Sequence, residues 1–445
     1  MIELLIVTFV LAGGGALSLS IARGFGPKAR QIVIASYGAH ALSAFVQVWI
    51  YRYLYGYGDM LVYHRNGMIL SDLMRYDFTR FFPDVVSLVF HGDPILPVWI
   101  FGAGSSTGTM SGLAGILCYV CADSLYAVTL VVAIVSFVGK VWLYRALAAQ
   151  LPRELEYRAL IAGLFVPSVV FWSSGLLKES FAIIGMGLMM LGIWTQRSWA
   201  SRIALVGMGT TVVMLVKAYV CFAMVPSIAV WFYWKRAMEK SGGKAVAVRP
   251  VYLVAAASAA LLLIVALGRM FPEYALENLA EHAARQQTTG SQYAGASNYQ
   301  LVEVDPNERR SFLGQLQFAP LALLTALFRP FLFESRNIQM AINALETTAL
   351  MLLFLHSVFT RSWVTLWARL RRSPTLMFCL TFTLTMGVSV GLASTNLGTL
   401  SRYRMPMIPF FAALVLVWTY SPRVRENAEP DAPRARERAS TLRGG

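Results

Sequence analysis

The sequence predicts an all-α fold: a polytopic transmembrane helical protein of about 11 spans, with re-entrant or interfacial helices on its outer face. Of the 445 residues, 57% are hydrophobic and only 14% are charged, and the mean hydropathy is +0.58. A soluble domain has too little interior to bury so much apolar surface. No apolar run alternates with the two-residue period of a barrel strand, so helices are the expected way to satisfy the backbone in lipid.

The spans follow from apolar runs of about 15 to 22 residues that are separated by polar or basic turns. We predict crossings at 3–21, 31–51, 124–144, 159–173, 181–195, 203–216, 219–234, 251–268, 340–359, 375–393 and 406–420. Residues 1–21 lack the basic start and small-residue cleavage site of a signal peptide, so we expect them to remain as the first span. The N-terminus is predicted to lie outside.

Two further apolar stretches are not counted as spans. If 316–333 crossed, the basic loop RSWVTLWARLRR (361–372) would move to the outer face, so we predict an interfacial or re-entrant helix there. Residues 95–122 contain the flexible polar break FGAGSSTGT (101–109), and they are predicted to form an outer-face helical hairpin.

The charge distribution sets the orientation. The formal net charge is +15, from 38 Lys and Arg against 23 Asp and Glu. Most of the basic residues lie in 23–30, 140–158, 197–202, 235–249, 361–372 and 421–445. Basic residues concentrate in cytoplasmic loops, so this excess reports topology, and no nucleic-acid partner is expected.

The chain is predicted to have two parts. Residues 1–420 form a polytopic membrane domain with outer-face loops at 52–123 and 269–339. Residues 421–445, which are polar and rich in Pro and Arg, form a disordered basic cytoplasmic tail. The four cysteines are expected to be small apolar packing residues: Cys118, Cys121, Cys221 and Cys379.

Polar side chains converge at the outer ends of the predicted spans. They come from five segments: Asp59, Tyr63, His64; Lys178; Lys217, Tyr219; Arg329, Glu334; and Arg402, Tyr403, Arg404. Ionisable groups near membrane depth are costly and usually face a functional cavity. The cations suit a phosphate or diphosphate, which arginine can bind with two parallel hydrogen bonds. Asp59 suits a general base for a hydroxyl, and the aromatic residues suit sugars and prenyl chains.

The expected ligand is therefore a phosphate-linked lipid that enters from the membrane. The sequence has no P-loop, no G-x-G-x-x-G after a strand and no H-E-x-x-H, so no nucleotide cofactor motif is present. The cofactor stays unknown, since the sequence decides neither for nor against a divalent metal.

Each site residue also has a simpler interpretation. Arg402 and Arg404 could anchor the chain at lipid headgroups, and Lys178 could pair with Glu179 within a turn. Asp59 could cap a helix that begins at Met60, and His64 could be a packing residue. If residues 402–404 are extended, Arg402 and Arg404 point the same way and address one phosphate.

Three sequence patches resemble the GT-C glycosyltransferases, integral membrane enzymes that use polyprenyl-phosphate-linked sugars. They are GDMLVYHRNG, VMLVKAYVCFAMVP and GTLSRYRMPMIPFFAALV. Two further patches, PSVVFWSSGLLKES and LFRPFLFESRN, look like patches of bacterial envelope-polysaccharide membrane proteins. The resemblance implies that Asp59 is the catalytic base and that Lys217, Arg402 and Arg404 are donor-phosphate contacts. The chain departs from the family because its aspartate follows the second span and because it has no large soluble C-terminal domain.

Three functions stay open at this stage. The first is a glycosyltransferase that moves a sugar from a polyprenyl-phosphate-linked donor to an outer-face glycan or lipid acceptor, with Lys178, Lys217, Arg329, Arg402 and Arg404 holding the phosphate. Tyr63, His64, Tyr219, Glu334 and Tyr403 would then contact substrate. The second is a polysaccharide polymerase or O-antigen ligase acting on lipid-diphosphate-linked glycans. The third is a transporter or flippase of an anionic lipid-linked substrate. The expected location is the bacterial inner membrane, with a periplasmic active face.

Overall fold

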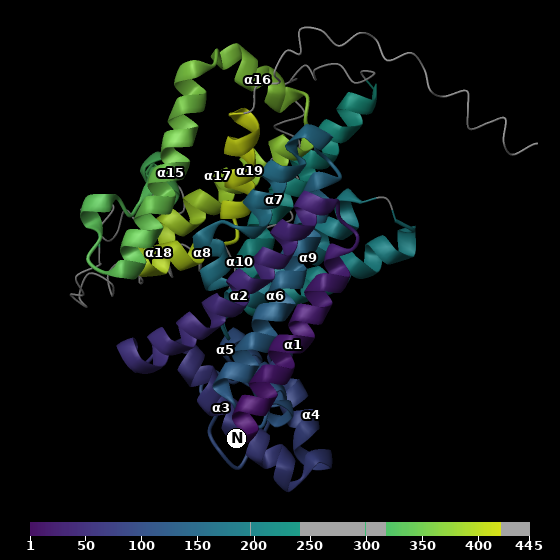
Figure 1. Cartoon of the computed structure of the whole chain (residues 1–445), viewed down its shortest axis with the longest axis vertical. Helices are drawn as coiled ribbons and strands as arrows, with labels where there is room; N and C mark the ends of the chain where they lie inside the picture. Colours follow the sequence, from purple (N-terminus) through teal and green to yellow (C-terminus); the bar gives the residue numbers. More distant parts are fainter. Residues whose placement is uncertain (196, 241–298, 300–316, 420–445) are drawn as a thin grey trace, which may run out of the picture.

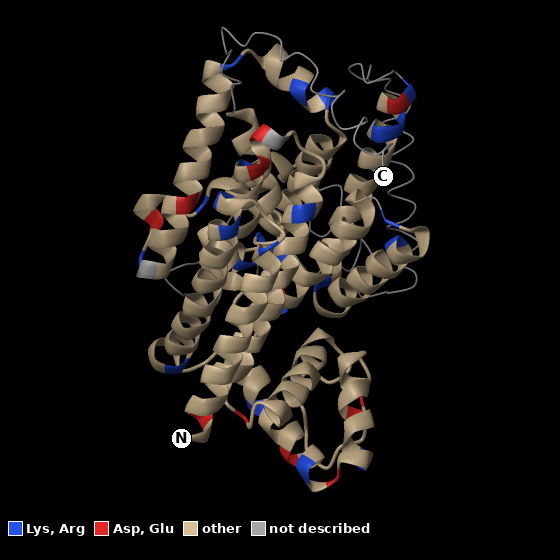
Figure 2. Cartoon of the chain, turned by 45° about the vertical axis from the view of Figure 1, so that its right-hand side comes forward, with Lys and Arg blue, Asp and Glu red and all other residues tan. Residues whose placement is uncertain are grey.

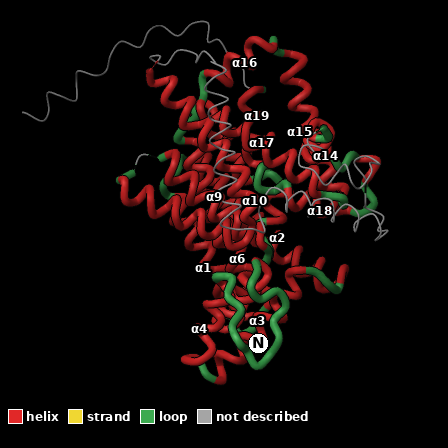
Figure 3. The backbone as a smooth tube through the Cα atoms, turned by 180° about the vertical axis from the view of Figure 1, so that it is seen from behind, coloured by secondary structure: helices red, strands yellow, loops and turns green. Residues whose placement is uncertain are grey.

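The computed structural model describes residues 1–195, 197–240, 299 and 317–419. Regular structure in these residues is helical, and no β-strand occurs among them (Figure 3). Charged residues are sparse along the helices (Figure 2). Within the described part, six helices are long and apolar enough to cross a membrane, or up to seven if one bent pair counts as a span. The predicted all-α class is confirmed in these residues, and the apolar helices fit a multi-pass membrane protein.

The helices follow one another along the chain as labelled in Figure 1. They are α1 (Ile2–Ala22), α2 (Pro27–Trp49) with the π-turn Ile50–Tyr55, α3 (Asp59–Tyr76), α4 (Phe78–Val89), α5 (Ser106–Val120), α6 (Leu125–Ala148), α7 (Glu156–Leu164), α8 (Pro167–Trp172), α9 (Lys178–Trp194), α10 (Trp199–Lys240), α14 (Ala319–Phe328), α15 (Ile338–Thr360), α16 (Trp363–Arg371), α17 (Pro374–Ala393), α18 (Leu397–Tyr403) and α19 (Ile408–Trp418).

Six helices coincide closely with predicted spans, namely α1, α2, α6, α9, α15 and α17. The predicted span 159–173 is instead two short helices, because Pro167 begins α8 and the residue before a proline disfavours helix. The predicted span 406–420 is the shorter helix α19, and α18 precedes it at an angle of 76°. The predicted span 251–268 and much of the loop 269–339 lie outside the described residues, as does the tail 421–445.

The α10 helix is interrupted at Lys217, whose φ of −152° and ψ of 66° are not helical. Its first half runs antiparallel to α9, because Arg202 Nε donates to Gly192 O near the end of α9 and Lys217 reaches Glu179 near its start. The second half leads away again to Trp234, whose indole N–H donates to the Arg371 carbonyl just before α17. The backbone therefore turns at Lys217, between the predicted spans 203–216 and 219–234.

Three helices, α3, α4 and α5, form a small bundle at one end of the molecule (Figure 1). It has its own apolar core, made by Leu70, Met74, Phe81, Val85, Leu88 and Ile100. Gly67 permits close packing of α3 on α5, since a Cβ there would lie 2.8 Å from Ala114. The predicted hairpin at 95–122 is wrong: residues 106–120 form α5 alone, and α5 pairs with α3 and α4 rather than with a second helix from that stretch.

In the described part of the stretch 316–333, the one α-helix is α14, a short apolar helix of 10 residues. It packs tightly on α17, since a Cβ at Gly391 would lie 2.1 Å from the Ala322 carbonyl oxygen. A helix of this length rises about 15 Å, which is half the thickness of a bilayer core. The length agrees with a helix that does not cross by itself.

The basic loops meet at the C-terminal end of α19. Arg158 donates to the Leu416 carbonyl, and Arg369 donates to the carbonyls of residues 417 and 418. Arg361 donates to the Thr419 carbonyl. These arginines satisfy carbonyls that have no partner within the helix, and they complement the negative end of its dipole. The contacts bring Arg158 of α7 and the connection from α15 to α17 to the same end of α19.

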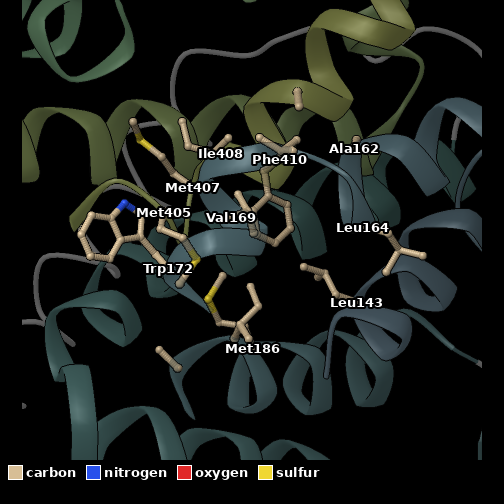
Figure 4. Close-up of a cluster of buried hydrophobic side chains, with 14 of the residues drawn as sticks. Leu143, Ala162, Leu164, Val169, Trp172, Met186, Met405, Met407, Ile408 and Phe410 are labelled. Atoms are coloured by element: carbon tan, nitrogen blue, oxygen red, sulfur yellow. The ribbon is translucent and has the colours of Figure 1, made fainter. Parts of the chain in front are cut away.

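A buried apolar core joins α6, α7, α8 and α9 to the junction of α18 and α19 (Figure 4). In it, Met405, Met407 and Phe410 lie near Trp172 and Met186, and all five are at least nine-tenths buried. Because this junction follows Arg402 directly, the core fixes the position of the arginine-bearing turn. The four cysteines are buried and free, as predicted.

Candidate functional site

Four chain segments meet where the polar residues were predicted to converge: the start of α3, the start of α9, the break in α10 and the end of α18. Arg402 lies at the centre. Its Nη1 donates to Asp59 Oδ2 at 2.6 Å, and its Nε donates to Glu179 Oε1 at 2.6 Å. Lys217 Nζ lies 2.5 Å from the same Glu179 oxygen. One guanidinium thus joins two carboxylates, and one of these carboxylates joins two cations.

The two carboxylates differ in their access to water. The Glu179 side chain is 0% exposed and that of Lys217 is 4% exposed, whereas the Asp59 side chain is 48% exposed. Arg402 lies between them, with a side chain 15% exposed. The network therefore runs from a sealed charge pair, through the guanidinium, to a carboxylate that faces solvent.

The local chain explains the position of Asp59. Gly56 ends the π-turn after α2 with φ +70°, and Gly58 precedes α3 with φ +130°; glycine adopts both conformations readily. A Cβ at Gly58 would lie 2.6 Å from the Tyr51 ring, so this position also needs a residue without a side chain. Asp59 is the first helical residue, and no side-chain capping bond is present. The cap interpretation is therefore wrong.

Tyrosines surround the sealed pair. The Tyr219 hydroxyl lies 3.0 Å from Lys217 Nζ, and the same ammonium lies 4.9 Å from the centre of the Tyr403 ring. Such cation–π contacts are strongest where the cation is desolvated. Tyr63 is buried on α3, one turn after Asp59. Burial, reinforced by the Asp59 carboxylate, raises the pKa of Tyr63, so its hydroxyl stays protonated.

Lys178, the first residue of α9, connects the cluster to α5. Its Nζ donates to Ser106 Oγ at 2.9 Å and to Thr107 Oγ1 at 3.1 Å, both at the start of α5. Burial lowers the pKa of Lys178 to about 8, although Asp59 and Glu179 oppose the shift. Lys178 forms no ion pair with Glu179, because Glu179 binds Lys217 and Arg402 instead. The turn-pair interpretation of Lys178 and Glu179 is therefore wrong.

Arg404 belongs to a second, separate cluster. It is 0% exposed, and its Nη1 donates to the backbone carbonyls of Ala326 and Arg329. The expected extended turn is wrong, because residues 397–403 are helical and Arg404 is the residue that caps their end. Side chains two residues apart on a helix point in different directions. Arg402 and Arg404 therefore do not address one phosphate.

Arg329 and Glu334 lie in this second cluster as well. Arg329 Nε donates to both Glu334 oxygens, at 2.9 and 3.2 Å. The guanidinium carbon lies 4.4 Å from the centre of the Tyr299 ring. Arg329 and Glu334 thus satisfy each other rather than joining the Asp59 network.

His64 also lies apart from the Asp59 network. Its Nε2 donates to the Asp123 carbonyl at 2.8 Å, a contact that packs α3 against the turn before α6.

The sequence predicts no role for Glu179 beyond the turn pair, and none for Ser106 or Thr107. Glu179 holds both Lys217 and Arg402, and the two hydroxyls hold Lys178. The available signal for Glu179 was an acid beside Lys178 among several predicted cations. Lysines and arginines that converge near membrane depth need a buried counter-charge.

The cluster as a whole offers three cations, Lys178, Lys217 and Arg402, against two carboxylates, Asp59 and Glu179. In the described ranges, no three His, Cys, Asp or Glu side chains gather as a metal site would require. The groups present can hold an anion and, at Asp59, accept a proton from a hydroxyl. No protein-family model, curated protein or solved structure matches this chain.

Proposed function

We propose that this protein is a membrane glycosyltransferase that moves a sugar from a polyprenyl-phosphate-linked donor to a glycan or lipid acceptor. One observation carries the proposal: the half-exposed carboxylate of Asp59 lies 2.6 Å from the guanidinium of Arg402, and buried Glu179 binds the same guanidinium through Nε. A potential base and a potential phosphate ligand therefore share one place.

In the proposed reaction, Asp59 takes the proton of an acceptor hydroxyl. Arg402 and Lys178 hold the donor phosphate and stabilise the charge that it gains as the glycosidic bond breaks. Lys217 is sealed beneath them, with a side chain 4% exposed, so its role is to balance Glu179 rather than to touch the donor. Tyr63 and Tyr403 pack beside this network.

The finer topology belongs to the same proposal. About 11 spans in a bacterial inner membrane, with the N-terminus outside, would put the Asp59 network on the periplasmic face, where envelope polysaccharide is assembled. The opposite placement of the arginines around the end of α19 supports this arrangement, because they would then face the cytoplasm.

Analysis of lipid-linked glycans in a deletion strain tests the proposal. We expect an intact polyprenyl-phosphate sugar to accumulate and a wild-type gene to clear it. An Asp59→Asn gene should fail to clear it, since loss of a general base costs about 10²–10⁴-fold. Asp72→Asn is the matched control, because it removes the same charge from the far end of α3, where Asp72 pairs only with Arg75.

The alternatives give different results. Accumulation of unpolymerised repeat units on a lipid diphosphate, together with rescue by Asp59→Asn, would favour the polymerase or ligase, which needs no catalytic aspartate. Loss of substrate from the outer leaflet, without any change in its glycan, would favour the transporter or flippase.

A further inference from the structure

In the proposed reaction Asp59 is the general base and Arg402 binds the donor phosphate, yet in the structure these two side chains contact each other. Arg402 Nη1, the nitrogen nearest to solvent-exposed Asp59, already donates to Oδ2 at 2.6 Å. A phosphate oxygen that accepts the N–H now bound to Asp59 would take the place of the carboxylate. A carboxylate that already accepts a charged hydrogen bond is also less available to accept a hydroxyl proton.

We propose that Asp59 and the donor phosphate compete for Arg402, so that the phosphate itself releases the base. This inference rests on the proposed function and concerns the control of the same site. Before the donor binds, Asp59 occupies the guanidinium as an internal anion. When the donor binds, its phosphate displaces the carboxylate, which then turns toward the acceptor hydroxyl.

The unequal burial of the two acids determines which one gives way. Glu179 is 0% exposed and binds both Lys217 and Arg402 Nε, so its release would leave Glu179 and Lys217 buried without a charged partner. Asp59 is 48% exposed, and water can replace Arg402 at its carboxylate. Arg402 therefore stays fixed on Glu179, and exchange occurs on the Asp59 side.

The chain before Asp59 permits such a movement. Gly56 and Gly58 both have positive φ, and Asp59 is in the first turn of α3, which carries no side-chain cap. Lys178 lies beyond the pair, with its ammonium held by two neutral hydroxyls rather than by a carboxylate. A phosphate that displaces Asp59 would thus meet a second cation that no acid neutralises directly.

The competition imposes an order on the reaction. The donor binds first, and Asp59 is then free to take the proton of the acceptor hydroxyl. The acceptor oxygen forms a bond to the anomeric carbon, and the bond from that carbon to the phosphate oxygen breaks. The bonding electron pair leaves with the phosphate, which Arg402 and Lys178 hold. Asp59 passes its proton to water, and departure of the phosphate then lets the carboxylate return to Arg402.

Binding of a phosphate lipid to neutral variants tests the competition without any transfer. The probe is farnesyl phosphate, with farnesol as its uncharged control, and the protein is the full chain in detergent. If Asp59 occupies Arg402 for most of the time, the apparent affinity is reduced by the fraction of closed sites. We expect Asp59→Asn to bind farnesyl phosphate at least about fivefold more tightly than wild type while losing transfer.

Three further variants complete the test. Asp59→Ser is a second neutral variant and should also tighten binding, whereas Asp59→Glu keeps the competing charge and should not. Asp72→Asn controls for net charge. Equal or weaker binding by both neutral variants, with wild type still binding the probe, would overturn the competition but leave the proposed function standing. Failure of every form to bind farnesyl phosphate over farnesol would overturn both.

Discussion

Arg402 and Arg404 are two residues apart, yet their side chains serve different clusters. Arg402 joins Asp59 to Glu179 at the meeting point of α3, α9 and α18. Arg404 is fully buried and donates to backbone carbonyls at the end of α14. The proposed exchange of Asp59 for a phosphate therefore concerns Arg402, whereas Arg404 binds the backbone.

Arg402→Lys should impair use of the donor by at least about tenfold. A lysine has one terminal nitrogen, so it cannot hold Glu179 and also present a second nitrogen to Asp59 or to a phosphate; a charged hydrogen bond is worth about 1.5–3 kcal/mol. The measurement is kcat/KM for the donor in purified protein. Arg75→Lys, at a surface ion pair of α3, is the control and should remain within about twofold.

Arg404→Lys should reduce stability and leave donor affinity unchanged. The shorter, unforked side chain would lose donation to the Ala326 and Arg329 carbonyls, at a cost of about 1–3 kcal/mol for buried groups left unsatisfied. The thermal midpoint in detergent should fall, and the KM for donor of the remaining folded protein should equal that of wild type. A raised KM with an unchanged midpoint would instead place Arg404 in the donor site.

Glu179→Gln should be strongly destabilising, because it leaves Lys217 and Arg402 near each other without their shared counter-charge. Breaking a buried pair in this way costs about 3–5 kcal/mol. A second change, Lys217→Met, removes one of the stranded cations and should recover part of the lost thermal stability. If the single variant unfolds at the wild-type temperature, Glu179 does not hold the site together.

The long helices could be predicted from sequence because apolar composition over a whole span is enough to identify them. Convergence of Asp59, Lys178, Lys217 and Arg402 could also be predicted, because each lies at the same end of a span. The ion pairs among them could not be predicted, since these depend on which neighbour is buried. From the sequence, Glu179 is the expected partner of adjacent Lys178, but in the structure the buried Glu179 carboxylate pairs with Lys217 and Arg402.

The extended conformation expected for residues 402–404 does not form, because α18 continues to Tyr403. The sequence did contain a contrary signal in Asn396, whose side chain accepts from the backbone N–H groups of Gly398 and Thr399 and so starts α18. The failed hairpin at 95–122 has another cause. Its helix finds its apolar partners in α3 and α4, which are separated from it by a loop and are not visible in local periodicity.

Labelling of introduced cysteines should place α4 and α16 on opposite sides of the membrane. The four native cysteines are buried, so they should react little in folded protein. Thr79 and Arg372 are both exposed. In intact cells with a permeable outer membrane, an impermeant maleimide should label Thr79→Cys at once and Arg372→Cys only after lysis. Equal labelling of the two before lysis would contradict the proposed topology.

The pH dependence of donor binding should report on Lys178. Burial lowers the pKa of this lysine to about 8, so in the empty site its ammonium is largely charged at pH 7 and largely neutral at pH 9. If the charged form holds the phosphate, affinity for farnesyl phosphate should fall as the pH rises through about 8. Lys178→Arg should abolish this fall, because a guanidinium stays charged throughout that range.

Stability should change in the opposite direction, which separates loss of binding from unfolding. The pKa of Lys178 is lower in the folded state than the ordinary lysine value of 10.5. Between about pH 8 and pH 10 the unfolded chain therefore binds more protons at this residue, and its contribution to the free energy of unfolding rises with pH. Comparison of wild type with Lys178→Met should show this rise in the thermal midpoint of wild type while its affinity falls. If affinity and midpoint fell together, unfolding would explain the loss; if affinity did not change with pH, Lys178 would not contact the phosphate.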